Sequence, residues 1–152
     1  MAWFTYQWTN DCRERMKKLG YSGKPLAKAA GTQFQRRGTE SGDVIYVIGY
    51  QNARAYLVGR MTVSIVRDRE SEDGEMWDGS DIIEGIDGTP MRFSRTIPSK
   101  ILEQLRFTDR KGKKVKGLAI TDGELDEPQA IRSLRRITEA SATLLDGCLT
   151  EG

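Results

Sequence analysis

The chain has 152 residues, 30% of them charged, and a formal net charge of +2. That length is enough for one domain whose core needs no disulfide or metal. Histidine is absent, which excludes Ser-His-Asp and Cys-His catalytic groups and zinc sites built on imidazole. There is no run of 18 apolar residues and no signal-peptide pattern in the first eight residues, so we expect a cytoplasmic protein without membrane contacts. Cys12 and Cys148 fit no metal-binding spacing and are expected to be reduced thiols.

The charge is unevenly distributed. Nine acidic residues and one arginine lie between Asp68 and Asp87, a net charge of −8 that leaves +10 for the rest of the chain. A basic surface suits nucleic acid, because neutralised phosphates release counterions, but it is equally compatible with an ordinary solvated surface. Trp77 lies inside this acidic loop, where it either anchors the loop to the core or contacts a ligand.

The first elements are predicted to be a strand and two helices. Aromatic residues alternate through Ala2–Trp8, which favours a strand. Asp11 and Glu14 have the spacing of a capping box, and Gly20 is placed to end the helix that they begin. Pro25 is predicted to start a second short helix.

A long hairpin follows. Its predicted strands are Val44–Ile48 and Ala55–Val66, joined by the polar loop Gly49–Ala53. Odd positions from Ala55 onward are apolar or small, which is the period of a strand. Gly59 lies in the middle, where a long strand needs a bulge to bend.

The remaining elements complete an α+β domain around a small, curved, mostly antiparallel sheet with short flanking helices. In order they are a strand at Asp81–Ile86, a strand at Pro90–Ile97, a helix at Ser99–Arg106, a cationic hairpin loop at Asp109–Lys116, a helix after Pro128, and a final helix capped by Thr138 and ended by Gly147.

Several segments together resemble the PUA-like superfamily, and within it the EVE-type domain. They are an aromatic first strand leading into a helix, Phe34-Gln35-Arg36-Arg37-Gly38, Ser41-Gly42-Asp43 entering an apolar strand, and Tyr56-Leu57-Val58-Gly59-Arg60-Met61. The resemblance covers roughly residues 2–66 and leaves 105–152 as a family-specific elaboration of one domain. It implies a small β-barrel with flanking short helices and a pocket that accepts a flipped or modified base. Gln7-Trp8-Thr9-Asn10 replaces the Lys-Ser-Glu-Pro-like run of EVE domains.

We therefore expect a non-catalytic module that binds DNA or RNA without a cofactor or metal. Bases stack on aromatic rings while nearby cations hold phosphates. The expected base pocket consists of Tyr6, Trp8, Asn10, Phe34 and Trp77. The expected phosphate-binding residues are Arg36, Arg37, Lys113 and Lys114.

Two alternatives remain open at this point. One is a small ASCH-like hydrolase of a modified nucleoside, in which Lys24 or Lys28 and Glu40 replace histidine. The other is a protein-interaction component of a defence or phage system that uses the acidic loop as its contact surface. None of the high-specificity enzyme motifs is present in the sequence, which favours the binding module.

Overall fold

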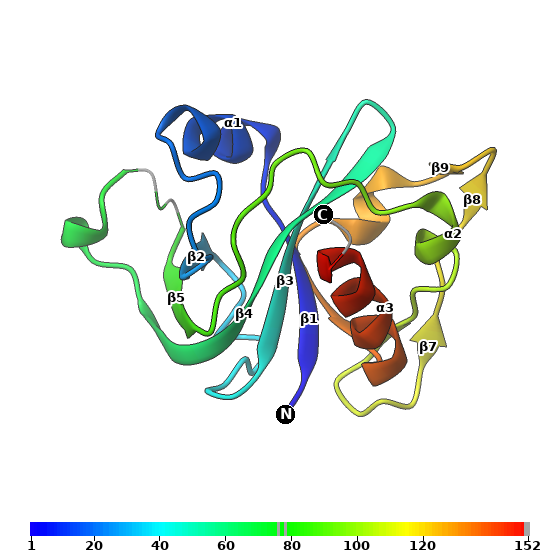
Figure 1. Ribbon diagram of the computed structural model, residues 1–152. Coiled ribbons are helices and arrows are strands. Elements are labelled where there is room, and N and C mark those ends of the chain that lie inside the picture. Colours follow the sequence, from blue (N-terminus) through cyan, green and yellow to red (C-terminus); the bar gives the residue numbers. More distant parts are fainter. Residues whose placement is uncertain (76, 78, 151–152) are drawn as a thin grey trace.

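An eight-stranded sheet runs through the computed structural model, which describes residues 1–75, 77 and 79–150 (Figure 1). The strand order is β2-β5-β4-β3-β1-β10-β6-β7, with β1 and β3 parallel and the other neighbours antiparallel. The strands are β1 (Trp3–Gln7), β2 (Lys28–Gly31), β3 (Val44–Gln51), β4 (Arg54–Asp68), β5 (Asp81–Ile86), β6 (Phe107–Thr108), β7 (Val115–Lys116) and β10 (Leu134–Ile137). Within the described residues the two edge strands are β2 and β7, so the α+β class is confirmed as a large mixed sheet that does not close.

Short helices and a small ribbon surround the sheet. They are α1 (Asn10–Lys18), α2 (Ser99–Leu102), α3 (Glu139–Thr150), the 3-10 turns Ser71–Asp73 and Pro128–Ile131, and the hairpin of β8 (Ile120–Thr121) with β9 (Glu124–Leu125). Figure 1 shows α1 and α3 on opposite sides of β1 and β3. β10 pairs with β1, so the C-terminal segment contributes a strand to the same sheet as the N-terminus.

The central part of the sheet is covered by a hydrophobic cluster on each face. Met16 of α1 belongs to one hydrophobic cluster with Phe34, Met61 and Trp77, which we call the α1-side cluster. Leu145 of α3 belongs to a second one with Tyr46, Leu57 and Ile137, which we call the α3-side cluster. A strand that is covered on both faces carries apolar residues at consecutive positions, as Val44–Ile48 does.

The long hairpin is confirmed, with a tighter turn than predicted. Asn52 and Ala53 have φ values of 53° and 61°, which makes them the central pair of a two-residue turn. Val47 pairs with Gly59 and Ile48 with Leu57, which leaves Val58 as a bulge one residue from the predicted position. The extra residue switches the faces, so Leu57 packs in the α3-side cluster and Met61 in the α1-side cluster.

Two predicted helices are strands. The segment after Pro25 forms β2, in which Ala29 lies opposite Ile83 of β5, because pairing with a neighbouring strand outweighs the helix propensity of alanine in so short a segment. The segment after Pro128 forms only a 3-10 turn before β10. Leu134 and Ile137 of β10 are three residues apart, and in a strand that spacing places them in the two opposite clusters.

The remaining corrections concern boundaries. Thr9, not Asp11, caps α1, because its Oγ1 accepts a hydrogen bond from the Cys12 N–H at 3.2 Å. Gly20 ends this helix with a φ of 81°, as predicted. Thr138 caps α3 as predicted, through a bond from the Ser141 N–H, but the helix continues past Gly147. The helix predicted at 99–106 spans only Ser99–Leu102.

The segment 90–97 is not a regular strand. It makes separate backbone bonds to the bulged residue of β4 and to the residue before it, from the Arg92 N–H to Val58 O at 3.0 Å and from the Leu57 N–H to Arg95 O at 2.9 Å. The bulge interrupts the ladder that a regular strand needs, and this explains why the prediction failed.

Candidate functional site

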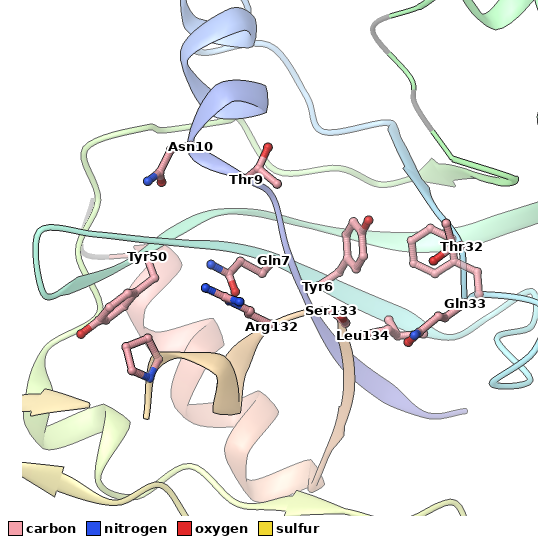
Figure 2. Close-up of a pocket in the computed structure, with 12 residues that line it drawn as sticks. Tyr6, Gln7, Thr9, Asn10, Thr32, Gln33, Tyr50, Arg132, Ser133 and Leu134 are labelled. Carbon is pink, nitrogen blue, oxygen red and sulfur yellow. The ribbon is translucent and has the colours of Figure 1, made fainter. Parts of the chain in front are cut away.

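A cavity of about 480 Å³ opens where β1 and β3 end and β10 begins (Figure 2). β1 and β3 are parallel, so their carboxyl ends, with Gln7 and Tyr50, lie at the same edge of the sheet. β10 runs the opposite way and brings its first residues to that edge. In Figure 2 the start of α1, with Thr9 and Asn10, lies above Gln7, while Arg132 and Ser133 approach from below. We call this cavity the base pocket.

The lining of the base pocket is polar but almost uncharged. It carries the amides of Gln7, Asn10 and Gln33, three hydroxyl side chains, and the rings of Tyr6, Phe34 and Tyr50. Figure 2 shows Tyr6 and Tyr50 on opposite sides of Gln7. Arg132 is the one charged side chain among the described lining residues. Such a lining suits a planar ligand that is uncharged and rich in hydrogen-bonding groups.

Tyr6 is held rigidly at the wall of the pocket. Its hydroxyl donates to Ala30 O at 2.7 Å, and its ring centroid lies 4.8 Å from that of Phe34 at an angle of 59°. Burial, followed by repulsion from the Cys12 sulfur where it ionises in alkali, raises the pKa of Tyr6 to about 12, so the phenol stays neutral at neutral pH. Gly31 leaves the room for this contact, because a Cβ there would lie 2.8 Å from the Tyr6 hydroxyl.

Asn10 is oriented by a buried arginine. Arg13 Nη1 donates to Asn10 Oδ1 at 3.2 Å, and Nη2 donates to Phe93 O at 3.4 Å. The Arg13 guanidinium also lies 4.6 Å from the centroid of the Tyr56 ring. This bond fixes the orientation of the Asn10 amide, whose Nδ2 carries two hydrogen-bond donors at the pocket lining.

Two amides of the pocket lack partners. Oε1 of Gln7 and Oε1 of Gln33 are both buried and accept no hydrogen bond from the described residues. Leaving a buried polar group unsatisfied costs about 1–3 kcal/mol, so such groups are rare in proteins. Both lie at a pocket wall, where a bound molecule can supply the missing hydrogen bonds.

A basic groove adjoins the base pocket. Two further cavities, of about 280 and 460 Å³, share Arg37 and Arg135 with each other, and the second shares Arg132 and Ser133 with the base pocket. Their described lining contains one carboxylate, Asp109, and eight cationic side chains. These are Arg36, Arg37, Arg110, Lys114, Lys116, Arg132, Arg135 and Arg136, and we call the surface they form the basic groove.

The groove is assembled from segments distant in sequence. Arg37 Nη1 donates to Leu134 O at 3.2 Å and joins the loop after β2 to β10. The hairpin of β6 and β7 brings in Arg110, which lies against Gly38 so closely that a Cβ there would be 2.5 Å from its Nη2. Desolvation and the charge of Arg37 lower the pKa of Arg135, as expected where cations crowd together without enough counterions.

The structure brings together most of the predicted site residues. Tyr6 and Asn10 line the base pocket, Phe34 is fully buried and packs behind the Tyr6 ring at its wall, and Arg36, Arg37 and Lys114 line the basic groove. Lys113 is exposed on the loop beside the groove but does not line it; its N–H donates to Asp109 Oδ1.

The structure corrects the prediction that Trp8 and Trp77 line the base pocket. Trp8 is 3% exposed and Trp77 is 9% exposed, and both belong to the α1-side cluster, so neither presents a face to a base. The period-two pattern of β1 correctly predicted that Trp8 lies on the same face of the strand as Phe4 and Tyr6. That face, however, packs into the core. Trp77 anchors the acidic loop to the core, one of the two roles left open for it.

The sequence did not reveal Gln7, Gln33 and Tyr50 as pocket residues, or Arg132, Arg135 and Arg136 as groove residues. The amides carry no sequence signal, because glutamine is common on any surface. The three arginines did carry a sequence signal, because they lie within five consecutive positions. The helix predicted for this segment, however, would have arranged their side chains differently from the strand that forms.

The residues of the hydrolase alternative lie outside the base pocket. Lys28 Nζ pairs with Asp73 at 2.6 Å and lies 5.3 Å from the centroid of the Trp77 ring. Lys24 stacks over Tyr21, and neither lysine nor Glu40 lines the pocket.

Within residues 1–75, 77 and 79–150, no three His, Cys, Asp or Glu side chains converge to hold a metal ion. Nor does the described chain contain a helix long and apolar enough to cross a membrane.

Comparison with known proteins shows the fold alone. The structure is similar to that of a hypothetical protein from Leishmania major, with a TM-score of 0.56 and 11% sequence identity over 99% of this chain and 96% of that chain. It also aligns with a protein from Agrobacterium tumefaciens, with a TM-score of 0.43 and 13% identity over 100% of this chain and 94% of that chain. No family model matches the chain, and no curated protein matches it.

Proposed function

We propose that this chain is a cytoplasmic, non-catalytic nucleic-acid-binding module that takes one flipped or modified base into the base pocket and holds the flanking phosphates in the basic groove. The observation that carries the proposal is that the two surfaces are continuous. Arg132 and Ser133 line both, so a nucleotide with its base in the pocket has its backbone beside the cations.

The chemistry of the pocket favours a base. Amides recognise base edges because each offers a donor and an acceptor at the spacing that bases present. Gln7 and Gln33 each have an acceptor without a partner, and Asn10 presents donors. Tyr50 provides an aromatic wall, and base–aromatic stacking contributes about 1–3 kcal/mol. A charged substrate would meet no carboxylate and no lysine among the described lining residues.

We also infer that the domain is EVE-type and that its open, bent sheet corresponds to the β-barrel of the PUA-like superfamily. The bent β4, which turns at the Val58 bulge from one cluster to the other, is the strand around which such a barrel would curve. The pocket at the end of the first strand, with Tyr6 and Asn10, lies where that resemblance implies a base-binding site.

The test is fluorescence anisotropy with single-stranded and duplex DNA and RNA, each with and without a methylated central base. Lys114→Gln together with Lys116→Gln is expected to weaken binding to all of them and to reduce the slope of log K against log salt by roughly 1.4–1.8. Lys17→Gln with Lys18→Gln, the same charge change on α1, serves as the matched control and should leave the slope unchanged. No binding to any of these probes at low salt would refute the proposal.

Gln33→Leu separates recognition from stability. The variant removes an amide whose Oε1 is unsatisfied in the free protein, so the free energy of unfolding should not fall. Affinity for the preferred base should fall by about tenfold, while affinity for an abasic strand stays the same. Equal affinity of both proteins for every base would show that the base pocket is not the recognition site.

A further inference from the structure

Another cavity, of about 470 Å³, lies beside the segment 92–96 and shares no lining residue with the base pocket or the basic groove. Its polar lining consists of Arg92, Arg95, Ser22, Ser94 and Thr96, with no carboxylate among the described residues. We call it the Arg95 pocket. Two arginines and three hydroxyl side chains therefore line one cavity together with Cys148, and no carboxylate among the described lining residues balances the arginines.

Arg95 is the unusual member of this set. Its Nε and Nη1 are buried and have no hydrogen-bond partner within the described part of the chain. A guanidinium is always charged and carries five N–H donors, so burying part of it without an acceptor is costly. Desolvation, followed by the charge of Arg92, lowers the pKa of Arg95, and the nearby Cys148 offsets this only in part.

A third arginine adds to the positive field. Arg13 Nη2 donates to Phe93 O in the same segment, and its guanidinium stacks on Tyr56, which forms a bridge with Thr96. The ion pairs found among the described residues involve none of Arg13, Arg92 and Arg95. Uncompensated charge in a partly enclosed site strengthens the attraction for an anion, because water screens it less.

The structure assigns to the Arg95 pocket the binding of a phosphate group. Guanidinium groups match phosphate oxygens with paired hydrogen bonds. The hydroxyls of Ser22 and Ser94 line the same cavity from two separate segments and offer further donors, which suits a phosphate because it has more oxygens than a carboxylate. The phosphate is either free, as inorganic phosphate or a small phosphomonoester, or part of a bound nucleic-acid backbone.

Thermal unfolding of the full chain with inorganic phosphate, against sodium chloride at equal ionic strength, tests the assignment. Phosphate is expected to raise the Tm of the wild-type protein and of Arg15→Met, an exposed α1 arginine changed in the same way. Arg95→Met is expected to keep its Tm without phosphate and to lose the phosphate-dependent rise, with Kd for phosphate in calorimetry at least about tenfold weaker. Arg92→Met provides a second variant with the same expected loss of affinity, should Arg95→Met fold poorly.

Oligonucleotide binding then distinguishes the two sources of phosphate. If the pocket holds a backbone phosphate, Arg95→Met weakens oligonucleotide binding and inorganic phosphate competes with it; if it holds a free phosphate, oligonucleotide affinity is unchanged in the variant. The assignment is overturned if phosphate raises the Tm no more than chloride does, or raises it equally in the wild-type protein and both pocket variants. This experiment measures the binding of inorganic phosphate and involves no base. Its result therefore stands even if the tests of the base pocket are negative.

Discussion

The indole rings of Trp8 and Trp77 meet edge to face, with centroids 6.3 Å apart and an interplanar angle of 63°. The contact joins the acidic loop to the end of β1 inside the α1-side cluster. We expect Trp77→Ala to lower the free energy of unfolding by about 3–5 kcal/mol in urea denaturation, and Trp77→Phe to lower it less. Oligonucleotide affinity under native conditions should not change. Lost affinity at unchanged stability would instead make Trp77 a ligand contact.

The carboxylate of Asp73 accepts bonds from Arg67 Nη2 at 2.7 Å and from Lys28 Nζ at 2.6 Å. These bonds, together with one from the Glu70 N–H, hold the pKa of this carboxyl well below its usual range. The folded-state pKa is lower than the unfolded one, so the stabilisation is present above about pH 4 and is lost as pH falls further. Asp73→Asn should therefore lower the Tm at pH 7, with the gap from wild type closing in acid. Glu72→Gln is the matched control, and a gap that does not depend on pH would contradict the ionic explanation.

Gly31 and Gly147 should respond in opposite ways to alanine. At Gly31 a Cβ would lie 2.8 Å from the Tyr6 hydroxyl and 3.0 Å from Phe34 Cε2, so Gly31→Ala should cost about 1–3 kcal/mol and displace the wall of the base pocket. At Gly147, inside α3, a Cβ meets no atom within 4 Å, and Gly147→Ala should add about 0.5–1 kcal/mol. Urea denaturation measures both changes. A stabilising Gly31→Ala would mean that Tyr6 is not held where we describe it.

The Tyr6 phenol should lose its proton only at unusually high pH, and the stability that it contributes should be lost there. Its pKa of about 12 lies above the unfolded value of about 10, so its contribution is complete below pH 10 and is lost as pH rises through 12. Tyr6→Phe, which loses the bond to Ala30 O, is expected to be about 1 kcal/mol less stable at pH 8. The difference should shrink by pH 11, as followed by circular dichroism. Absorbance titration should show one late-titrating phenol fewer in the variant.

Local pattern was sufficient where the residues of a strand alternate clearly along its own length. The alternation in Ala2–Trp8 and the apolar period of Ala55–Val66 predicted β1, β4 and even the bend near Gly59. Strand geometry sends alternate side chains to opposite faces whatever lies beyond them, so the grouping of Phe4, Tyr6 and Trp8 was also correct.

Tertiary structure alone decided which of those faces is core and which elements meet. β2 and β10 are strands because β5 and β1 lie beside them, a fact absent from their own residues. The base pocket joins Gln7, Gln33, Tyr50 and Arg132, and burial turned Trp8 from a predicted stacking residue into a core residue. Burial depends on partners distant in the chain, so the sequence by itself determined the strands whose own residues alternate, such as β1 and β4, and the basic character of the protein. Only the packing of the sheet determined the other strands and the pockets.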